Sequence, residues 1–297
     1  MTQSTNPLCN LPKKLPEPYS RFGDTLPSVP HVITEVSSLL DNERTSAADL
    51  CKVISRDQAI VTKILAIANS PLYGLPRRVA TVEFAIVIIG FEHMRNVLVA
   101  LSLVDAFKSR SGANWNHDSY WMHSLLTATA AKRIADDLRY PKSGEVFTAA
   151  LLHDLGLVVL QRYMNYDFNN IVKLVQEQQI SYFNAEKIVL GFTHQEIAEY
   201  LLERWNFPTY ITEAVSNHHT PSLSDNGKVL SSLIHLADYM TQRIGIGTFE
   251  WDDNYIFDEN IIEILGFGSM DYLDGFIASY EPLFRGHMES LLEKTTK

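Results

Sequence analysis

The sequence has only two cysteines, Cys9 and Cys51, which stand far apart rather than in a Cys-x-x-Cys pair. A disulfide framework or a zinc site built from thiolates needs more cysteines at closer spacing. Both kinds of site are therefore disfavoured. The two residues are expected to be free thiols in a reducing compartment.

Positive charge is also scarce, because 25 Lys and Arg face 35 Asp and Glu and leave a formal net charge of −10. Proteins that bind a nucleic-acid backbone normally present a basic face, and anionic membrane surfaces attract basic segments. The most basic spots are the pairs Arg77-Arg78 and Lys132-Arg133, which are typical of a solvated surface. We therefore expect no nucleic acid and no membrane among the partners.

Long hydrophobic runs are missing as well. The N-terminus, Met1–Asn6, has neither the basic nor the apolar part of a signal peptide. The longest apolar run, Phe84–Phe91, is far shorter than the ~20 residues that a membrane-spanning helix needs. The hydrophobic content of 46% still suffices for a substantial core. The sequence thus predicts a soluble, cytoplasmic protein.

No alternating strand pattern of convincing length occurs, and the apolar residues instead recur at helical spacing. Two capping-box sequences, Ser46–Asp49 and Thr193–Glu196, mark the starts of helices. The sequence therefore predicts an all-α protein. The expected organisation is a flexible, proline-containing arm at 1–25, a helical subdomain at 26–110, a second helical subdomain at 115–245, and a C-terminal helical extension at 246–297.

Three expected helices of the second subdomain carry ionisable residues in apolar surroundings. The first begins at Ser143 and carries His153 and Asp154. The second has Pro208 at its first position and runs into His218-His219. The third spans Val229–Ile244 and carries Asp238.

The stretch Ala149–Gly156 places Asp154 in a run whose flanks are apolar. A carboxylate buried without a partner costs several kcal/mol, a large share of a typical stability of about 5–15 kcal/mol. Asp154 must therefore be neutralised by a hydrogen-bonded or basic side chain, by a proton, or by a metal ion.

Other ionisable residues gather between Trp121 and Asp238. Each alone is ordinary: a lone helical histidine is more often a core or surface residue than a ligand, and Asp238 could pair with an arginine. Together they match the way in which facing helices build metal sites from imidazoles and carboxylates, a ligand set that suits iron, manganese or zinc. The candidate metal ligands are His123, His153, Asp154, His194, His218, His219 and Asp238.

The order of these residues resembles the HD superfamily of metal-dependent phosphohydrolases, and most closely its HDOD (HD-related output domain) family of bacterial signalling proteins. The resemblance covers about residues 20–245. The motifs that carry it are Leu26-Pro27, Ile54–Asp57, Ala68–Ser70, Ala85–Gly90, Trp121–Ser124, Leu151–Gly156, Leu190–His194, Trp205–Pro208, His218-His219 and Ala237-Asp238.

The resemblance implies an all-α fold with an HD-like helical core preceded by an additional N-terminal helical subdomain. It implies one or two divalent ions, of iron, manganese or magnesium. His123, His153, Asp154 and Asp238 match the core metal positions, with Asp154 bridging if two metals bind, and the other three histidines match those of two-metal HD enzymes. In an active enzyme Asp154, His218 and His219 would be the catalytic residues.

The sequence departs from the branch that hydrolyses cyclic di-GMP. Leu157 stands where that branch typically has a lysine, Thr220–Leu223 replaces its Gly-Tyr-Pro signature, and Ser119 replaces an acidic residue one turn before the first histidine. These departures disfavour hydrolysis of cyclic di-GMP.

Two functions follow from the sequence, and a third is ranked below them. The first is a regulatory protein that retains an HD-type metal site and acts on a signalling protein partner. The second is an active metal-dependent phosphohydrolase on a nucleotide or other phosphoester. The third is a helical protein whose histidines only pair internally.

Overall fold

The protein is described by a computed structural model that covers residues 45–70, 73, 75, 77–106, 114–205, 207–245 and 254–295. Within these ranges the regular secondary structure is helical and contains no β-strand, so the all-α prediction is confirmed. The predicted arm at 1–25 and the helical spacing that begins near Pro30 lie outside the described residues.

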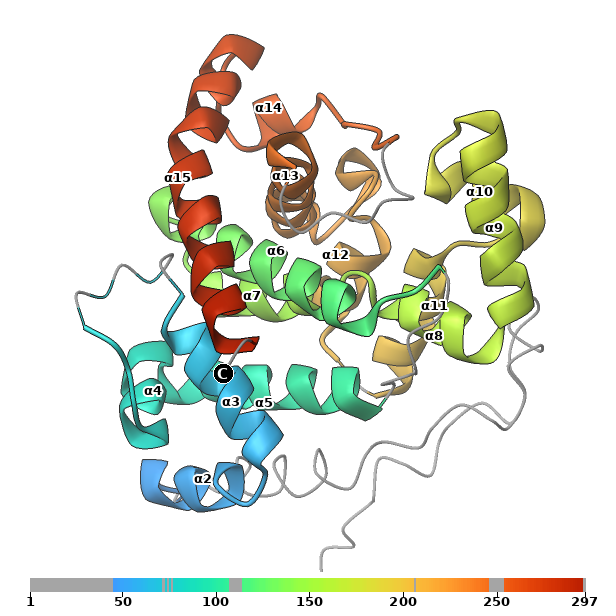
Figure 1. The fold of residues 1–297 in the computed structure, drawn as a ribbon. Coiled ribbons are helices and arrows are strands. Elements are labelled where there is room, and N and C mark those ends of the chain that lie inside the picture. The colour runs from blue at the N-terminus through green and yellow to red at the C-terminus, as the bar shows by residue number, and fades with distance from the viewer. Residues whose placement is uncertain are drawn as a thin grey trace, which may run out of the picture.

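The first helices form an N-terminal group at the lower left of Figure 1. Local capping explains where they begin. The Ser46 hydroxyl and the Asp49 carboxylate form the predicted capping box, and Asp57 and Thr81 accept from backbone N–H groups of the next two helices. The Asn69 amide then bonds both backbone groups of Val79 and closes the intervening loop. The helices are α2 (Ala47–Ile54), α3 (Gln58–Ala68), α4 (Val82–Ile89) and α5 (Phe91–Ala106).

The second group of helices surrounds α6, which packs against α7 and α13, while α5 of the first group packs on α7. In Figure 1, α6 and α7 lie between the N-terminal group and the pair α9–α10. The members are α6 (His117–Asp137), α7 (Ser143–Leu152), α8 (Leu155–Tyr163), α9 (Asn165–Gln178), α10 (Tyr182–Val189), α11 (His194–Arg204), α12 (Thr209–Ser216), a short 3₁₀ helix (Pro221–Leu223) and α13 (Lys228–Ile244).

The stretch Ser143–Tyr163 is long and apolar enough to cross a membrane, but 94% of its apolar window is buried inside the protein. It comprises α7 and α8 and forms the centre of the helical packing, as the core helices of globular proteins do. The cytoplasmic location stays a prediction.

Three expectations about helix boundaries are wrong. The helix that begins at Ser143 ends at Leu152, so His153 and Asp154 occupy the break before α8 instead of lying within one helix. Likewise α12 ends at Ser216, and the pair His218-His219 lies in the following turn. In both breaks a histidine Nδ1 donates to the carbonyl three residues earlier, at Ala150 and Val215. The side chain thus supplies the hydrogen bond that a carbonyl in the last turn of a helix otherwise lacks. Pro208 is also the N-cap residue rather than the first residue of α12.

Beyond residue 253 the chain forms α14 (Ile261–Ile264) and the long α15 (Met270–Thr295). Helix α15 packs along α6 and α13 (Figure 1). Polar contacts hold it at two points: Tyr280 donates to Asp137 of α6, and Arg243 of α13 pairs with Asp274. These helices lie in the predicted C-terminal extension.

Gly156 allows α8 to approach the start of α11. A Cβ atom at this position would stand 1.9 Å from the His194 carbonyl oxygen, which is a backbone atom that cannot turn aside. We therefore expect Gly156→Ala to destabilise the fold by about 1–3 kcal/mol, as overpacking does, and to lower the melting temperature. Gly275→Ala is the matched control, since a Cβ there meets nothing within 4 Å. Because Gly275 lies inside α15, two turns before its centre, the Gly275→Ala control should stabilise the protein by roughly 1 kcal/mol. Equal melting temperatures for the two variants would contradict this account.

Candidate metal centre

The seven predicted ligands come together where five segments of the second group meet. His123 lies on α6, His153 and Asp154 lie in the α7–α8 break, and His194 is the first residue of α11. The turn after α12 carries His218 and His219, and helix α13 carries Asp238. Three overlapping sets have ligand atoms that all lie within 4.8 Å of one another: His123, His153 and Asp238; His153, Asp154 and His218; His194, His218 and His219.

The carboxylate of Asp154 stands at the middle of this cluster. Its Oδ2 lies 3.5 Å from His123 Nε2 and 3.3 Å from His153 Nε2. Its Oδ1 lies 3.5 Å from His194 Nε2 and 3.6 Å from His218 Nε2. Each oxygen therefore faces its own pair of histidines, which is the placement that a carboxylate bridging two cations requires.

The second carboxylate, of Asp238, faces the same side as His123. Its Oδ1 lies 3.2 Å from His123 Nε2 and 3.9 Å from His153 Nε2, yet neither contact has the geometry of a hydrogen bond. Within the described residues the ion-pair partners of Asp154 and Asp238 are histidines, so the arginine partner considered for Asp238 is not found.

Hydrogen bonds on the far side of the imidazoles fix which nitrogen faces the centre. The Nδ1 atoms of His153 and His218 lie 2.7 Å from the carbonyls of Ala150 and Val215, which can only accept. In the neutral ring Nδ1 therefore carries the hydrogen and Nε2 presents a lone pair. The two Nε2 atoms of His194 and His218 are 3.5 Å apart, so lone pairs face one another across the centre.

The pKa values show how the metal-free cluster is balanced. Burial would lower the pKa of His123, but contacts with Asp154 and Asp238 outweigh it and raise that pKa to about 10. Burial alone would raise the pKa of both aspartates. The surrounding histidines outweigh burial, so that the pKa of Asp238 is lowered and that of Asp154 is lowered well below its ordinary value. A protonated His123 is thus the partner of two ionised carboxylates in the absence of metal.

The pair His218-His219 is held neutral. Burial, together with the neighbouring histidines, lowers the pKa of each well below its ordinary value. Their ring centroids lie 4.1 Å apart with the planes tilted by 44°, and the His219 ring lies 5.2 Å from that of His194 at the half-buried edge of the cluster. Neutral imidazole is the form that coordinates a metal.

Glu186 on α10 is a buried residue in contact with the cluster that the sequence did not single out. Its side chain is fully buried, and Oε2 accepts from the His194 backbone N–H at 3.1 Å and from His194 Nδ1 at 2.8 Å. Burial raises its pKa, an effect that His194 partly offsets. The sequence did offer one indication that Glu186 is buried, because it lies one helical turn after the apolar, buried Tyr182 on the same helix. A carboxylate behind a histidine orients the ring and increases its basicity toward a metal.

His235 on α13 is a second such residue, and it holds the turn that carries His218. Its Nδ1 lies 2.8 Å from the His218 carbonyl, and its Nε2 accepts from the Asp258 backbone N–H at 2.9 Å. The Tyr255 hydroxyl lies 2.9 Å from the same ring. Burial lowers the pKa of His235, which keeps the ring in the neutral form that these bonds need.

The helical fold and the buried cluster define a class of protein. Its members are all-α proteins in which several helices bring histidine and aspartate side chains together in the order of the HD motif. The comparison with protein families agrees: the chain belongs to the HDOD domain family, whose model matches residues 26–221. Asp238 lies beyond the matched range.

Solved structures share the fold. An HDOD domain protein of unknown function from Geobacter sulfurreducens is 24% identical with a TM-score of 0.71, over 89% of this chain and 93% of that one. A candidate signal-transduction protein from Marinobacter aquaeolei VT8 is 21% identical with a TM-score of 0.67, over 90% and 60%. A candidate phosphohydrolase from Shewanella amazonensis SB2B is 19% identical with a TM-score of 0.66, over 90% and 96%. At these identities the likeness concerns the fold.

Among curated proteins, an uncharacterized protein from Treponema pallidum (strain Nichols) is 24% identical over 222 residues. The match covers 72% of this chain and 42% of the relative, so the chain spans less than half of that protein's length.

Removal of the Glu186 carboxylate should weaken metal binding at His194. We expect Glu186→Ala to lower the affinity for Mn²⁺ by about 10–100-fold, the usual effect of losing such an outer partner, as measured by calorimetric titration. Glu186→Gln should lose less, because its amide oxygen can still accept from Nδ1. Glu177→Ala, which removes an exposed acid of α9, serves as the control. An unchanged affinity in a normally folded Glu186→Ala protein would rule out this role.

Proposed function

We propose that this chain is an HDOD-type signal-transduction protein whose buried centre binds one or two divalent metal ions. The observation that carries the proposal is the position of Asp154, whose two oxygens face separate pairs of histidine Nε2 atoms. Such a convergence of lone pairs and negative charge in a buried space favours a cation.

The donor set fits the metals that the family resemblance implies. Imidazole nitrogens and carboxylate oxygens suit iron and manganese, and a structural zinc site would normally contain thiolates or a simpler tetrahedron of ligands. His123, His153 and Asp238 with Asp154 Oδ2 would hold one ion. Asp154 Oδ1 with His194, His218 and His219 would hold a second.

A regulatory role is favoured by what surrounds this centre. Leu157, at the position of the lysine in enzymes that hydrolyse cyclic di-GMP, is 3% exposed and packs in the core, so it offers no charge to a phosphate. The segment that replaces the Gly-Tyr-Pro signature forms the 3₁₀ helix Pro221–Leu223. The proposed output is contact with a signalling protein partner, tuned by the metal content of the centre.

A metal-dependent phosphohydrolase acting on a nucleotide or other phosphoester is the second candidate, favoured by the two-sided environment of Asp154. Bound divalent ions would polarise phosphoryl oxygens and lower the pKa of a coordinated water to about 7. Asp154 would fix the spacing of the two ligand sets. His218 and His219 have strongly lowered pKa values and are neutral at pH 7, which favours them as ligands over proton donors.

Elemental analysis of protein purified without an affinity tag tests metal binding. We expect one or two equivalents of iron or manganese per chain. His153→Ala and the isosteric Asp154→Asn should retain less than half of this content, whereas His93→Ala, outside the centre, should retain all of it. Metal-free wild-type protein, or equal content in all variants, would refute the proposal.

The change in thermal stability when metal is added back to metal-free protein is an independent test of metal binding. Mn²⁺ at 100 times its dissociation constant should stabilise the folded state by about 2.7 kcal/mol and raise the melting temperature by several degrees. The shift should vanish in Asp154→Asn. Identical melting curves with and without Mn²⁺ or Fe²⁺ would instead favour internally paired histidines.

Hydrolysis of a generic phosphodiester by the metal-loaded protein separates the two candidates. Turnover that is lost in His153→Ala would establish the phosphohydrolase. If the metal-loaded wild-type protein shows no more turnover than His153→Ala, the phosphohydrolase is excluded and the regulatory function is favoured.

A further inference from the structure

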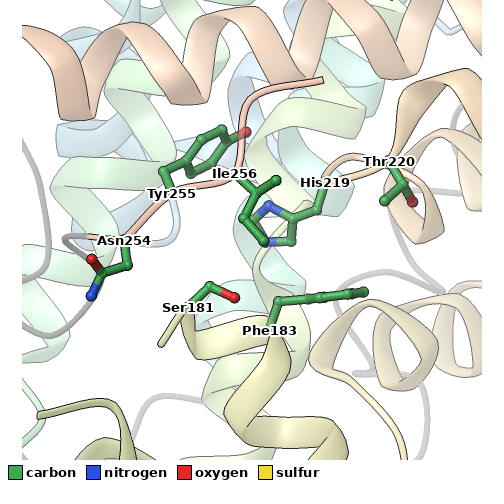
Figure 2. Close-up of a pocket in the computed structure, with 7 residues that line it drawn as sticks. All are labelled: Ser181, Phe183, His219, Thr220, Asn254, Tyr255 and Ile256. Atoms are coloured by element: carbon green, nitrogen blue, oxygen red, sulfur yellow. The ribbon is translucent and has the colours of Figure 1, made fainter. Parts of the chain in front are cut away.

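One ligand of the metal centre is less covered than the others. Six of the seven candidate ligands are buried, and His219 alone is half-buried. Beside it lies a cavity of about 50 Å³, which has room for a few water molecules but not for a drug-sized ligand. Figure 2 shows its lining, which comes from the start of α10, the turn after α12 and the segment before α14. An ion that reaches the centre from this side must pass His219.

The ring of His219 is held less firmly than the rings next to it. A hydrogen bond at Nδ1 fixes each of His194 and His218. Among the described residues His219 has ring contacts only, and its centroid lies 5.9 Å from that of Phe183 and 5.4 Å from that of Tyr255 (Figure 2). Because a hydrogen bond behind a histidine ligand is what fixes its orientation, the His219 ring can turn when one of these two walls moves.

One of the two walls belongs to the segment Asn254–Asp258, which we call the strap. It has no regular secondary structure, and hydrogen bonds tie it to elements that carry metal ligands. The Tyr255 hydroxyl donates to the His235 carbonyl at 3.3 Å, and the Asp258 backbone N–H donates to His235 Nε2 at 2.9 Å. Asp258 Oδ2 in turn accepts from the Ser222 backbone N–H at 3.0 Å. The strap is therefore closed over the cavity by bonds to α13 and to the 3₁₀ helix.

The strap has little apolar burial to hold it in place. None of its five residues is fully buried, in contrast to the metal ligands behind it. Its main packing contact is Phe257, whose ring centroid lies 4.4 Å from that of Tyr239. Segments with few buried apolar contacts open locally at a much lower free energy than global unfolding requires. The strap can therefore be displaced while the helices that carry the ligands stay folded.

We propose that the strap is a gate for metal exchange, and that an ion enters or leaves the centre past His219 only while the strap is displaced. This inference rests on the proposed metal site and names how its occupancy is regulated. The family match ends at residue 221, so the strap lies beyond it, in the C-terminal extension. For a signal-transduction protein, the gate makes the metal content of the centre depend on the state of that extension.

Rapid mixing of metal-free protein with Mn²⁺, with the free ion followed by a metal-sensitive dye, tests the gate in the wild-type chain. We expect the observed rate of binding to level off as the Mn²⁺ concentration rises, because opening of the strap must precede binding. A rate that rises in proportion to the Mn²⁺ concentration throughout would overturn the gate.

Variants of Asp258 locate the effect. Asp258→Ala removes the anchor to Ser222 and should raise both the limiting rate of binding and the rate of Mn²⁺ release to excess EDTA about tenfold. The equilibrium affinity should stay the same, because a gate accelerates entry and exit alike. Asp258→Asn keeps an acceptor oxygen and should show a smaller increase, which also serves if the alanine variant does not fold. Asp225→Ala, which removes an exposed acid of the preceding loop, is the matched control and should leave the rates unchanged.

A weakened affinity with unchanged limiting rates in the two Asp258 variants would identify Asp258 as a structural support and overturn the gate. Equal rates in the Asp258 variants and in Asp225→Ala would overturn it as well.

A measurement without metal separates this inference from the proposed function. Diethyl pyrocarbonate acylates accessible neutral imidazoles, and burial together with the neighbouring histidines lowers the pKa of His219 well below its ordinary value. In metal-free protein, Asp258→Ala should raise the rate of modification at His219, read by mass spectrometry, about tenfold, and Asp225→Ala should not change it. If the protein binds no metal, the proposed function fails, and this rate still decides whether the strap covers His219. Metal binding with equal modification rates in all variants would overturn the gate and leave the metal site standing.

Discussion

The carboxylate of Asp154 is the constraint on which the structure depends. It is 6% exposed, lies at a break between two core helices, and its ion-pair partners among the described residues are imidazoles. A buried carboxylate is tolerated only with compensating charge and hydrogen bonds, so the elements around it serve to deliver histidines at defined positions. The close approach at Gly156, the break after Leu152 and the capping box at Thr193 all place groups around this one side chain.

The features that the sequence predicted are those set by local chemistry. Helix starts at Ser46 and Thr193 follow from side-chain oxygens that accept backbone N–H groups, and such bonds span only three residues. The seven candidate ligands could be identified because ionisable residues in apolar helical surroundings need a reason to be there. Their assembly into one cluster fits that reasoning, while metal binding itself stays a proposal.

The features that the sequence did not predict depend on side chains that bond other groups, either within one turn or between elements. The break between α7 and α8 could not be read from an unbroken apolar run, because a histidine side chain replaces the helical bond there. Glu186 acquires its role through His194, eight residues later, and His235 through a carbonyl on another element and an amide near α14. A residue whose function is to hold another residue has no signature of its own in the sequence.

The position of α13 has a consequence for the limits of the functional unit. The family match ends at residue 221, but Asp238 and His235 both lie on α13, which packs along α6. A fragment cut at the end of the family match would leave His123 without one of its two carboxylates and would release the turn that carries His218. The smallest piece of this chain that contains the whole centre and all of α13 therefore extends through Ile244, beyond the end of the family match at residue 221.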